Sequence, residues 1–138
     1  MNEENIKHLE MIEGAVERMA SNSFQLKGWA VTLVALIGGL ASKGSDRRFL
    51  LLAFIPLIAF WFLDAYYLQL ERKYRVLYQN VVDHKISNFC MDLQKIRYIG
   101  DEADRVCYCR CFWAKTEAAF YFTIIVAVSL LTVILVLK

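Results

Sequence analysis

FLLLAFIPLIAFWFLDAYYLQL, residues 49–70, is the stretch that decides the fold, and Asp64 is its only charged side chain. A helix needs about 20 apolar residues to cross the ~30 Å hydrocarbon core of a bilayer. The stretch therefore predicts a membrane-spanning helix. A carboxylate inside such a helix is costly and usually finds a charged partner, water or the interface, so Asp64 is either an anchor or part of a working site.

Two further segments are apolar enough to span. Residues 118–137 (AAFYFTIIVAVSLLTVILVL) form an uninterrupted run that is long enough to cross a bilayer. Residues 28–42 (GWAVTLVALIGGLAS) are shorter, and they predict a span when extended back to Phe24, with the Lys27 ammonium reaching the headgroups. The polar residues 43–48 (KGSDRR) then predict a tight turn and an antiparallel helical hairpin.

The composition supports an integral membrane protein. Hydrophobic residues make up 58% of the 138 residues, against about 45–50% in an average soluble domain. We predict an all-α membrane bundle of three transmembrane helices with helical soluble extensions. Its parts are an amphipathic soluble helix (1–27), a transmembrane hairpin (28–70), a soluble helical segment (71–115) and a third transmembrane helix (116–138).

The two soluble segments carry apolar residues at helical spacing. In the first, the apolar positions recur at intervals of three and four, which indicates an amphipathic helix; they are Ile6, Leu9, Ile12, Val16 and Met19. After the second span a less regular pattern continues to residue 93 and predicts a helical extension. Gly100, Asp101 and Glu102 then predict a turn before the chain returns to the membrane.

Hairpin geometry gives Asp64 a candidate partner. If the turn is centred between Ser45 and Asp46, Lys27 and Asp64 lie at the same depth, and Glu117 falls near the same layer. Pairing lowers the desolvation cost of both charges. We therefore predict an interfacial charged cluster of Lys27, Asp64 and Glu117, with Lys115 completing a ring. It is interpreted first as a structural pin or headgroup anchor, and alternatively as a gate, a proton site or a ligand contact.

Small residues mark the faces on which membrane helices can meet. Small-xxx-small faces allow the close backbone approach that drives helix association in lipid. In the first span these residues are Ala35, Gly38, Gly39 and Ser42, and in the third they are Ala119, Thr123 and Ala127. We expect a homo-oligomer, and the alternative is that these faces pack only within one protomer.

A water-filled pore within one chain is harder to support. The hydroxyls within the spans form no continuous polar stripe, so a channel-like protein would gate by dewetting or be lined by several protomers. Pro56, which removes one helix hydrogen bond, is a possible kink near the middle of the second span.

The cysteines form an unusual CxCxC pattern. Cys107, Cys109 and Cys111 alternate, with Cys90 upstream, whereas structural zinc sites favour CxxC pairs. On a helix Cys107 and Cys111 would share a face. Interfacial packing is the favoured interpretation, with metal or redox chemistry and S-acylation as alternatives, and we expect no metal and no cofactor.

Catalysis and nucleic-acid binding are not indicated. The chain has no Gly-rich phosphate loop, no GxSxG and no HExxH, and its only histidines are His8 and His84. The net charge of +2 comes without a basic run interleaved with aromatics. We expect neither an enzyme nor a nucleic-acid partner.

Lysine and arginine suggest an orientation. Cations are in excess over acids in residues 71–115, and the N-terminal segment adds three more, which favours a cytoplasmic N-terminus. The three cations of residues 43–48 argue for the reverse. A cleaved signal peptide is disfavoured because the N-terminal segment is rich in glutamate.

Two strings carry a resemblance to a protein class. RMASNSFQLKGWAVTLVALIGGL (18–40) and IPLIAFWFLDAYYLQLERKYRVLYQNV (55–81) resemble small bacterial multi-span membrane proteins, similar to the short membrane effectors of anti-phage defence systems. The resemblance implies a protein that oligomerises and perturbs the inner membrane once a cytoplasmic sensor or a small nucleotide signal reaches its soluble part. There, an anionic ligand would meet Arg72, Lys73, Arg75, Arg97 and Arg105. No site residues of a family are carried over.

Two other functions stay open. The chain could be a non-conducting membrane anchor or assembly subunit for a soluble partner. A transporter subunit is a weaker alternative, because the three spans show neither an inverted repeat nor a broken helix pair.

Overall fold

The structure, a computed structural model, describes residues 3–42, 49–83, 91–93 and 101–137. Within them the chain is helical and contains no strand, which confirms the all-α class. The helices are α1 (Glu3–Ser42), α2 (Phe49–Leu52), α3 (Phe54–Val82), α4 (Asp101–Val106), α5 (Tyr108–Phe112) and α6 (Lys115–Leu137).

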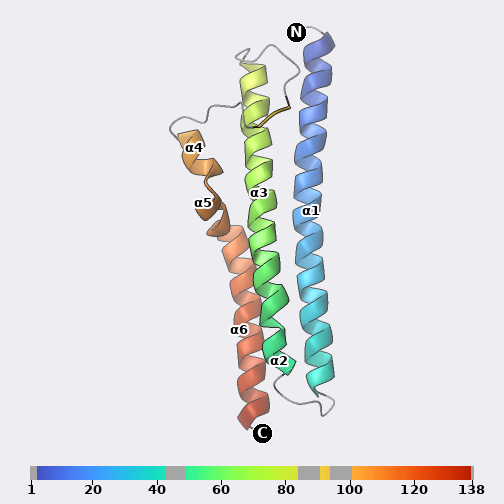
Figure 1. The fold of residues 1–138 in the computed structure, drawn as a ribbon, viewed down its shortest axis with the longest axis vertical. Coiled ribbons are helices and arrows are strands. Elements are labelled where there is room, and N and C mark those ends of the chain that lie inside the picture. Colours follow the sequence, from blue (N-terminus) through green and yellow to red (C-terminus); the bar gives the residue numbers. More distant parts are fainter. Residues whose placement is uncertain (1–2, 43–48, 84–90, 94–100, 138) are drawn as a thin grey trace.

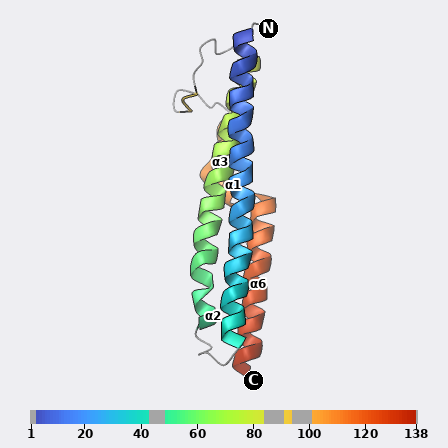
Figure 2. The same ribbon diagram turned by 90° about the vertical axis from the view of Figure 1, so that its right-hand side faces the viewer.

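The helices form an elongated bundle (Figure 1). α1 and α3 run antiparallel along each other for most of their length, and α6 packs beside them in the half that contains α2 and the C-terminus (Figures 1 and 2). The short helices α4 and α5 pack against α3 in the other half. The bundle is therefore three helices thick at one end, and the N- and C-termini lie at opposite ends (Figure 1).

Three helices are long and apolar enough to cross a membrane. They are Glu3–Ala41, Leu50–Val82 and Lys115–Ile134. In their most apolar windows only 11%, 28% and 17% of the residues, respectively, are buried inside the protein. Apolar surface that faces outward over a whole helix suits lipid rather than water. The prediction of three transmembrane helices is thus confirmed by the length and composition of the helices.

α1 is one continuous helix through the predicted boundary at residue 27. Its buried side chains follow one stripe at spacings of three or four residues or sums of these, as expected for a helix that keeps one face on a partner; they include His8, Ile12, Ala15, Ser23 and Ala30. Of the predicted amphipathic face, Leu9 and Ile12 are buried, whereas Ile6 is 42% exposed. The stripe runs without a break along α1 and contributes residues to both core clusters described next.

The two core clusters lie at different heights. One joins α1, α3 and α4 through Leu9, Ile12, Val76, Leu77, Val81 and Val106. The other lies among the apolar spans and is built on Ala30, Leu57 and Tyr121. The first cluster holds together the half of the bundle that α6 does not reach.

Pro56 interrupts the second long helix nearer its start than its middle. Pro56 has no N–H to donate to the carbonyl of Leu52, and the break between α2 and α3 falls at the next residue, Ala53. Ala53 keeps helical angles (φ −65°, ψ −24°), and its N–H donates to the Leu50 carbonyl at 3.1 Å. Pro56 then lies in the first turn of α3, where a missing donor is tolerated.

The helical extension after the second span is shorter than predicted. α3 ends at Val82, with the Asp83 N–H bonded to the Gln79 carbonyl at 2.9 Å, and residues 91–93 are not helical. Two valines followed by an aspartate are weak helix formers, which fits an end here. Asp101 and Glu102 begin α4 instead of forming a turn. Gly100 and the predicted turn at 43–48 lie outside the described residues.

The core cluster that joins α1, α3 and α4 predicts that substitutions at two neighbouring positions of α1 change the unfolding free energy by very different amounts. Replacing Ile12, which is fully buried, by alanine should cost about 2–4 kcal/mol of unfolding free energy through the cavity that it leaves. Met11→Ala is the matched control, because Met11 is 54% exposed, and it should stay within about 0.5 kcal/mol. Chemical unfolding in detergent micelles measures both, and equal losses would contradict the packing described.

Candidate functional site

A cluster of charged side chains joins the three long helices. Lys27 of α1 places its Nζ 2.7 Å from Oδ2 of Asp64 on α3 and 3.0 Å from Oε1 of Glu117 on α6. The three residues predicted as a charged cluster are thus in direct contact. We call them, with Ser23 and Tyr121, the membrane charge cluster.

Two hydroxyl residues complete the membrane charge cluster, and sequence reasoning missed both. The Tyr121 hydroxyl donates to Oδ2 of Asp64 at 3.0 Å, and Ser23 donates to Oδ1 of the same carboxylate. Ser23 also accepts a hydrogen bond from Lys27 Nζ at 2.9 Å. Each lies four residues from a predicted member, Ser23 before Lys27 and Tyr121 after Glu117, so helical spacing was the available signal.

The membrane charge cluster is buried and carries more acid than base. Asp64 is fully buried and Glu117 is 4% exposed, while one ammonium serves both carboxylates. Glu117 Oε2 is buried without a hydrogen-bond partner among the described residues. Breaking a buried ion pair leaves an uncompensated charge and is strongly destabilising. Lys115 is exposed and makes no ion pair with the described residues, so the predicted four-membered ring does not form.

Stacked aromatic rings lie directly against this cluster. Trp61 of α3 stacks on Tyr121 at a centroid distance of 5.7 Å and on Phe112 of α5 at 4.4 Å. Trp113 meets Trp61 edge to face at 6.1 Å. The rings connect the Tyr121 end of the charge cluster to the segment between α5 and α6.

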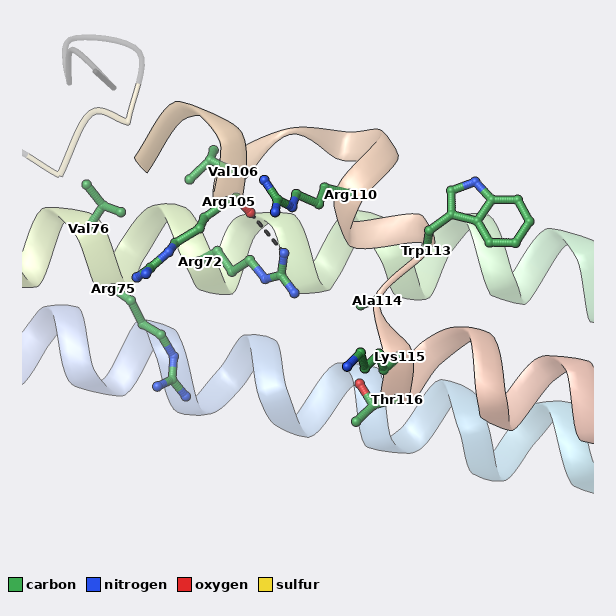
Figure 3. A pocket seen from close by; sticks show the side chains of 10 residues that line it. All are labelled: Arg72, Arg75, Val76, Arg105, Val106, Arg110, Trp113, Ala114, Lys115 and Thr116. Carbon is green, nitrogen blue, oxygen red and sulfur yellow. Dashed lines mark hydrogen bonds between the residues drawn. The ribbon is translucent and has the colours of Figure 1, made fainter. Parts of the chain in front are cut away.

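A basic groove, lined in part by Trp113, lies next to these rings (Figure 3). It has a volume of about 640 Å³ and is lined from α3, α4, α5 and the start of α6. Its charged lining residues are all cationic, and we call it the cationic groove; they are Arg72, Arg75, Arg105, Arg110 and Lys115.

Only part of the charge in the cationic groove is neutralised. Arg75 pairs with Glu71 at 2.8 Å, and Arg110 pairs with Asp104. Among the described residues, Arg72, Arg105 and Lys115 form no ion pair. Arg72 instead donates to the backbone carbonyl of Arg105 at 2.9 Å, drawn as the dashed line in Figure 3. That bond holds its guanidinium at the groove.

The structure brings together three of the five cations predicted to meet an anion. Arg72, Arg75 and Arg105 line the cationic groove, whereas Lys73 does not, and Arg97 lies outside the described residues. Arg110 and Lys115 were not predicted. Arg110 reaches the groove because α5 packs on α3, and Lys115 because α6 packs on α3; no local sequence pattern predicts these long-range contacts.

The predicted helix-packing residues mostly face outward. Ala35, Ala119, Thr123, Ala127 and Gly39 are on exposed surface. Gly38 is half-buried, and a Cβ added there would lie 3.7 Å from Leu131. Within one protomer the predicted faces of α1 and α6 are therefore largely not used for packing.

The cysteines do not share a face. Cys107 precedes α5 in an extended conformation and is exposed, Cys109 is exposed, and Cys111 is buried. The prediction that Cys107 and Cys111 lie on one helical face is wrong because the helix begins only after Cys107. Cys90 lies outside the described residues. No group of three or more His, Cys, Asp or Glu side chains in the described ranges is placed to hold a metal ion.

Removing members of the membrane charge cluster should affect stability unequally. Lys27→Met leaves two buried carboxylates without a cation and should cost about 3–5 kcal/mol. Asp64→Asn keeps the pair between Lys27 and Glu117 and should cost about 1–3 kcal/mol. The combined variant should lose less than the sum, because its members share one network. Denaturant titration in micelles measures all three.

Lys115→Met is the control for that series, because Lys115 is exposed and outside the membrane charge cluster. It should change the unfolding free energy by no more than about 0.5 kcal/mol. The cluster would not be a cooperative unit if the losses of unfolding free energy were strictly additive, or if Lys27→Met were as stable as the wild type.

The thiols should differ in reactivity. Burial raises the pKa of the Cys111 thiol, and the neighbouring Arg72 only partly offsets this effect. A raised pKa keeps the thiol protonated at neutral pH, and the thiolate is the reactive form. In a Cys90→Ser background, maleimide at pH 7 should label Cys107 and Cys109 and leave Cys111 unmodified until the protein is unfolded. Labelling of Cys111 in the folded protein at the rate of the other two would contradict its burial.

Comparison with protein-family models, with curated proteins and with solved structures found no match. The function proposed for the chain therefore rests on its own residues, on their geometry and on the resemblance described for residues 18–40 and 55–81.

Proposed function

We propose that this chain is an integral membrane effector that oligomerises and permeabilises the bacterial inner membrane in response to a cytoplasmic signal, in anti-phage defence. The signal would come from a sensor protein or a small nucleotide. One observation carries the proposal. The cationic groove and the membrane charge cluster share two helices, α3 and α6.

The two sites are close along both helices. Arg72 lies eight residues after Asp64 on α3, which is about 12 Å at 1.5 Å per residue. On α6, Lys115 lines the groove and Glu117 belongs to the cluster. An anion that draws Arg72 and Lys115 together would therefore move the two helices that share Lys27. The rings of Trp61, Phe112 and Tyr121 provide a packed path between the sites.

Outward-facing small residues support oligomerisation. Ala119, Thr123 and Ala127 recur at four-residue intervals on exposed surface of α6, where a second copy could approach closely. Four hydroxyls within the spans, those of Thr32, Thr123, Ser129 and Thr132, donate to their own helix backbone, as Thr123 does to Ala119 at 2.7 Å. In the described residues of one protomer these hydroxyls are not free to line a pore, and a water path would lie between protomers.

The orientation follows from charge. Positive-inside bias favours a cytoplasmic location for the end of the bundle that contains the cationic groove. With three spans, the N-terminus would be cytoplasmic and the C-terminus outside. The groove would then face the compartment in which a cytoplasmic signal appears.

A non-conducting anchor or assembly subunit is the second candidate. It is favoured by the core cluster of Leu9, Ile12, Val76 and Leu77, which holds α1 and α3 together in the half of the bundle that α6 does not reach. Such an antiparallel pair could present a docking platform to a soluble partner without any opening in the membrane.

Induced expression in bacteria with a membrane-potential dye separates the two candidates. The effector should depolarise the cells when the signal is present, and Ala127→Leu, which fills the small-residue face of α6, should reduce depolarisation at least fivefold by blocking close approach. The matched control is Ala59→Leu, the same substitution on exposed surface of α3. It should depolarise like the wild type.

An intact potential under triggering conditions, with the protein correctly inserted, would reject the effector and favour the anchor. Depolarisation by a protein that cross-linking in membranes shows to be monomeric would reject the oligomeric pore.

A further inference from the structure

The cationic groove carries a charge imbalance that is unusual for a surface pocket of this protein. Its five charged lining residues are all cations, and only the charges of Arg75 and Arg110 are balanced by nearby carboxylates. Like charges around one cavity repel each other, at a cost that a bound anion removes. The groove is thus better suited to an anion than to remaining open.

The chemistry of the groove favours a particular anion. Four of its five cations are arginines, whose planar fork matches the oxygens of a phosphate or a carboxylate in bidentate geometry. Arg72 is held in place by its bond to the Arg105 carbonyl, so its guanidinium is already oriented and less entropy is lost on binding. Lys115 adds a point charge from the opposite wall (Figure 3).

The depth of the groove in the membrane favours phosphate over carboxylate as the bound anion. The apolar run of α6, residues 118–137, has 20 residues and a length of about 30 Å, which matches the hydrocarbon core. Lys115 therefore lies at the boundary of the core, and the groove lies just beyond it, in the headgroup layer. Trp113, which is 70% exposed at the groove, is typical of this layer. The anions concentrated at that depth are phosphates.

We infer that the cationic groove is a binding site for a phosphate group, supplied either by the headgroup of an anionic phospholipid or by a soluble phosphate compound. The inference deepens the proposed function, because it gives the chemical class of the anion that the signal site receives. It rests on the proposed function for the consequence of binding, but not for the binding itself.

Two binding measurements on the purified chain distinguish the sources. One follows inorganic pyrophosphate binding to the protein in phosphatidylcholine nanodiscs at fixed ionic strength. The other uses native mass spectrometry to count phosphatidylglycerol molecules retained from mixed nanodiscs. We expect the wild type to bind at least one probe, and Arg72→Gln with Arg105→Gln to weaken that binding at least tenfold, through loss of charge-assisted bonds.

Lys73→Gln is the matched control, since Lys73 is adjacent to Arg72 in sequence but does not line the groove. It should bind within about twofold of the wild type. Because Arg72 also anchors the backbone of α4, the double variant could misfold. Lys115→Gln removes an exposed cation that forms no ion pair with the described residues, and it should weaken the same binding about threefold while leaving the fold intact.

Each outcome either supports the phosphate site or rejects it. Retention of phosphatidylglycerol alone supports a lipid headgroup, and pyrophosphate binding alone supports a soluble phosphate compound. Binding of neither probe, binding that Lys115→Gln leaves unchanged, or equal affinity for succinate would overturn the inference. Phosphate binding without depolarisation in cells would reject the effector function and leave the site intact. Depolarisation without phosphate binding would reject the site alone.

Discussion

One ammonium shared by two carboxylates is the interaction on which the rest of the bundle depends. Lys27 contacts Asp64 and Glu117, so a single side chain of α1 fixes the heights of α3 and α6. Apolar packing in lipid does little to fix the relative axial positions of the helices, because sliding one apolar helix along another exposes no new surface to water. A buried charge that must stay paired penalises sliding. The aromatic stack and the cationic groove occupy definite positions because the three helices are held in register at this point.

The sequence predicted the architecture better than the detail. Three apolar runs of spanning length led directly to three helices, and counting outward from the turn placed Lys27 level with Asp64. Ser23 and Tyr121 escaped notice because a hydroxyl on an apolar helix looks the same whether it bonds its own backbone or a carboxylate. The break at Ala53 was misplaced because Pro56 disturbs the turn before it rather than the turn on which it lies. Arg110 joins the groove through the packing of α5 on α3 and Lys115 through the packing of α6 on α3, and both contacts are between residues far apart in sequence.

The two charged sites have opposite imbalances. The membrane charge cluster carries an excess of carboxylate, and the cationic groove carries an excess of cation. For Arg72, which lies eight residues or about 12 Å along α3 from Asp64, an effective dielectric constant of about 20 gives an interaction of about 1.4 kcal/mol between two unit charges. Neutralising the groove would remove that attraction and change the energy of the cluster without any atom touching it. Packed rings and electrostatics therefore offer two separate routes by which anion binding at the groove can affect the interior of the bundle.

The arrangement around Lys27 also imposes an order on biogenesis. Lys27 and Glu117 are 90 residues apart in the chain, so the ribosome delivers the ammonium long before its second carboxylate. The first span must enter the bilayer carrying an unmatched cation, which Asp64 neutralises when the hairpin closes. The third span arrives last, and its Glu117 can be buried cheaply only beside a hairpin that is already formed. A hairpin in the wrong register would not place Lys27 where Glu117 can pair with it, so docking of the final helix would depend on the register of the first two.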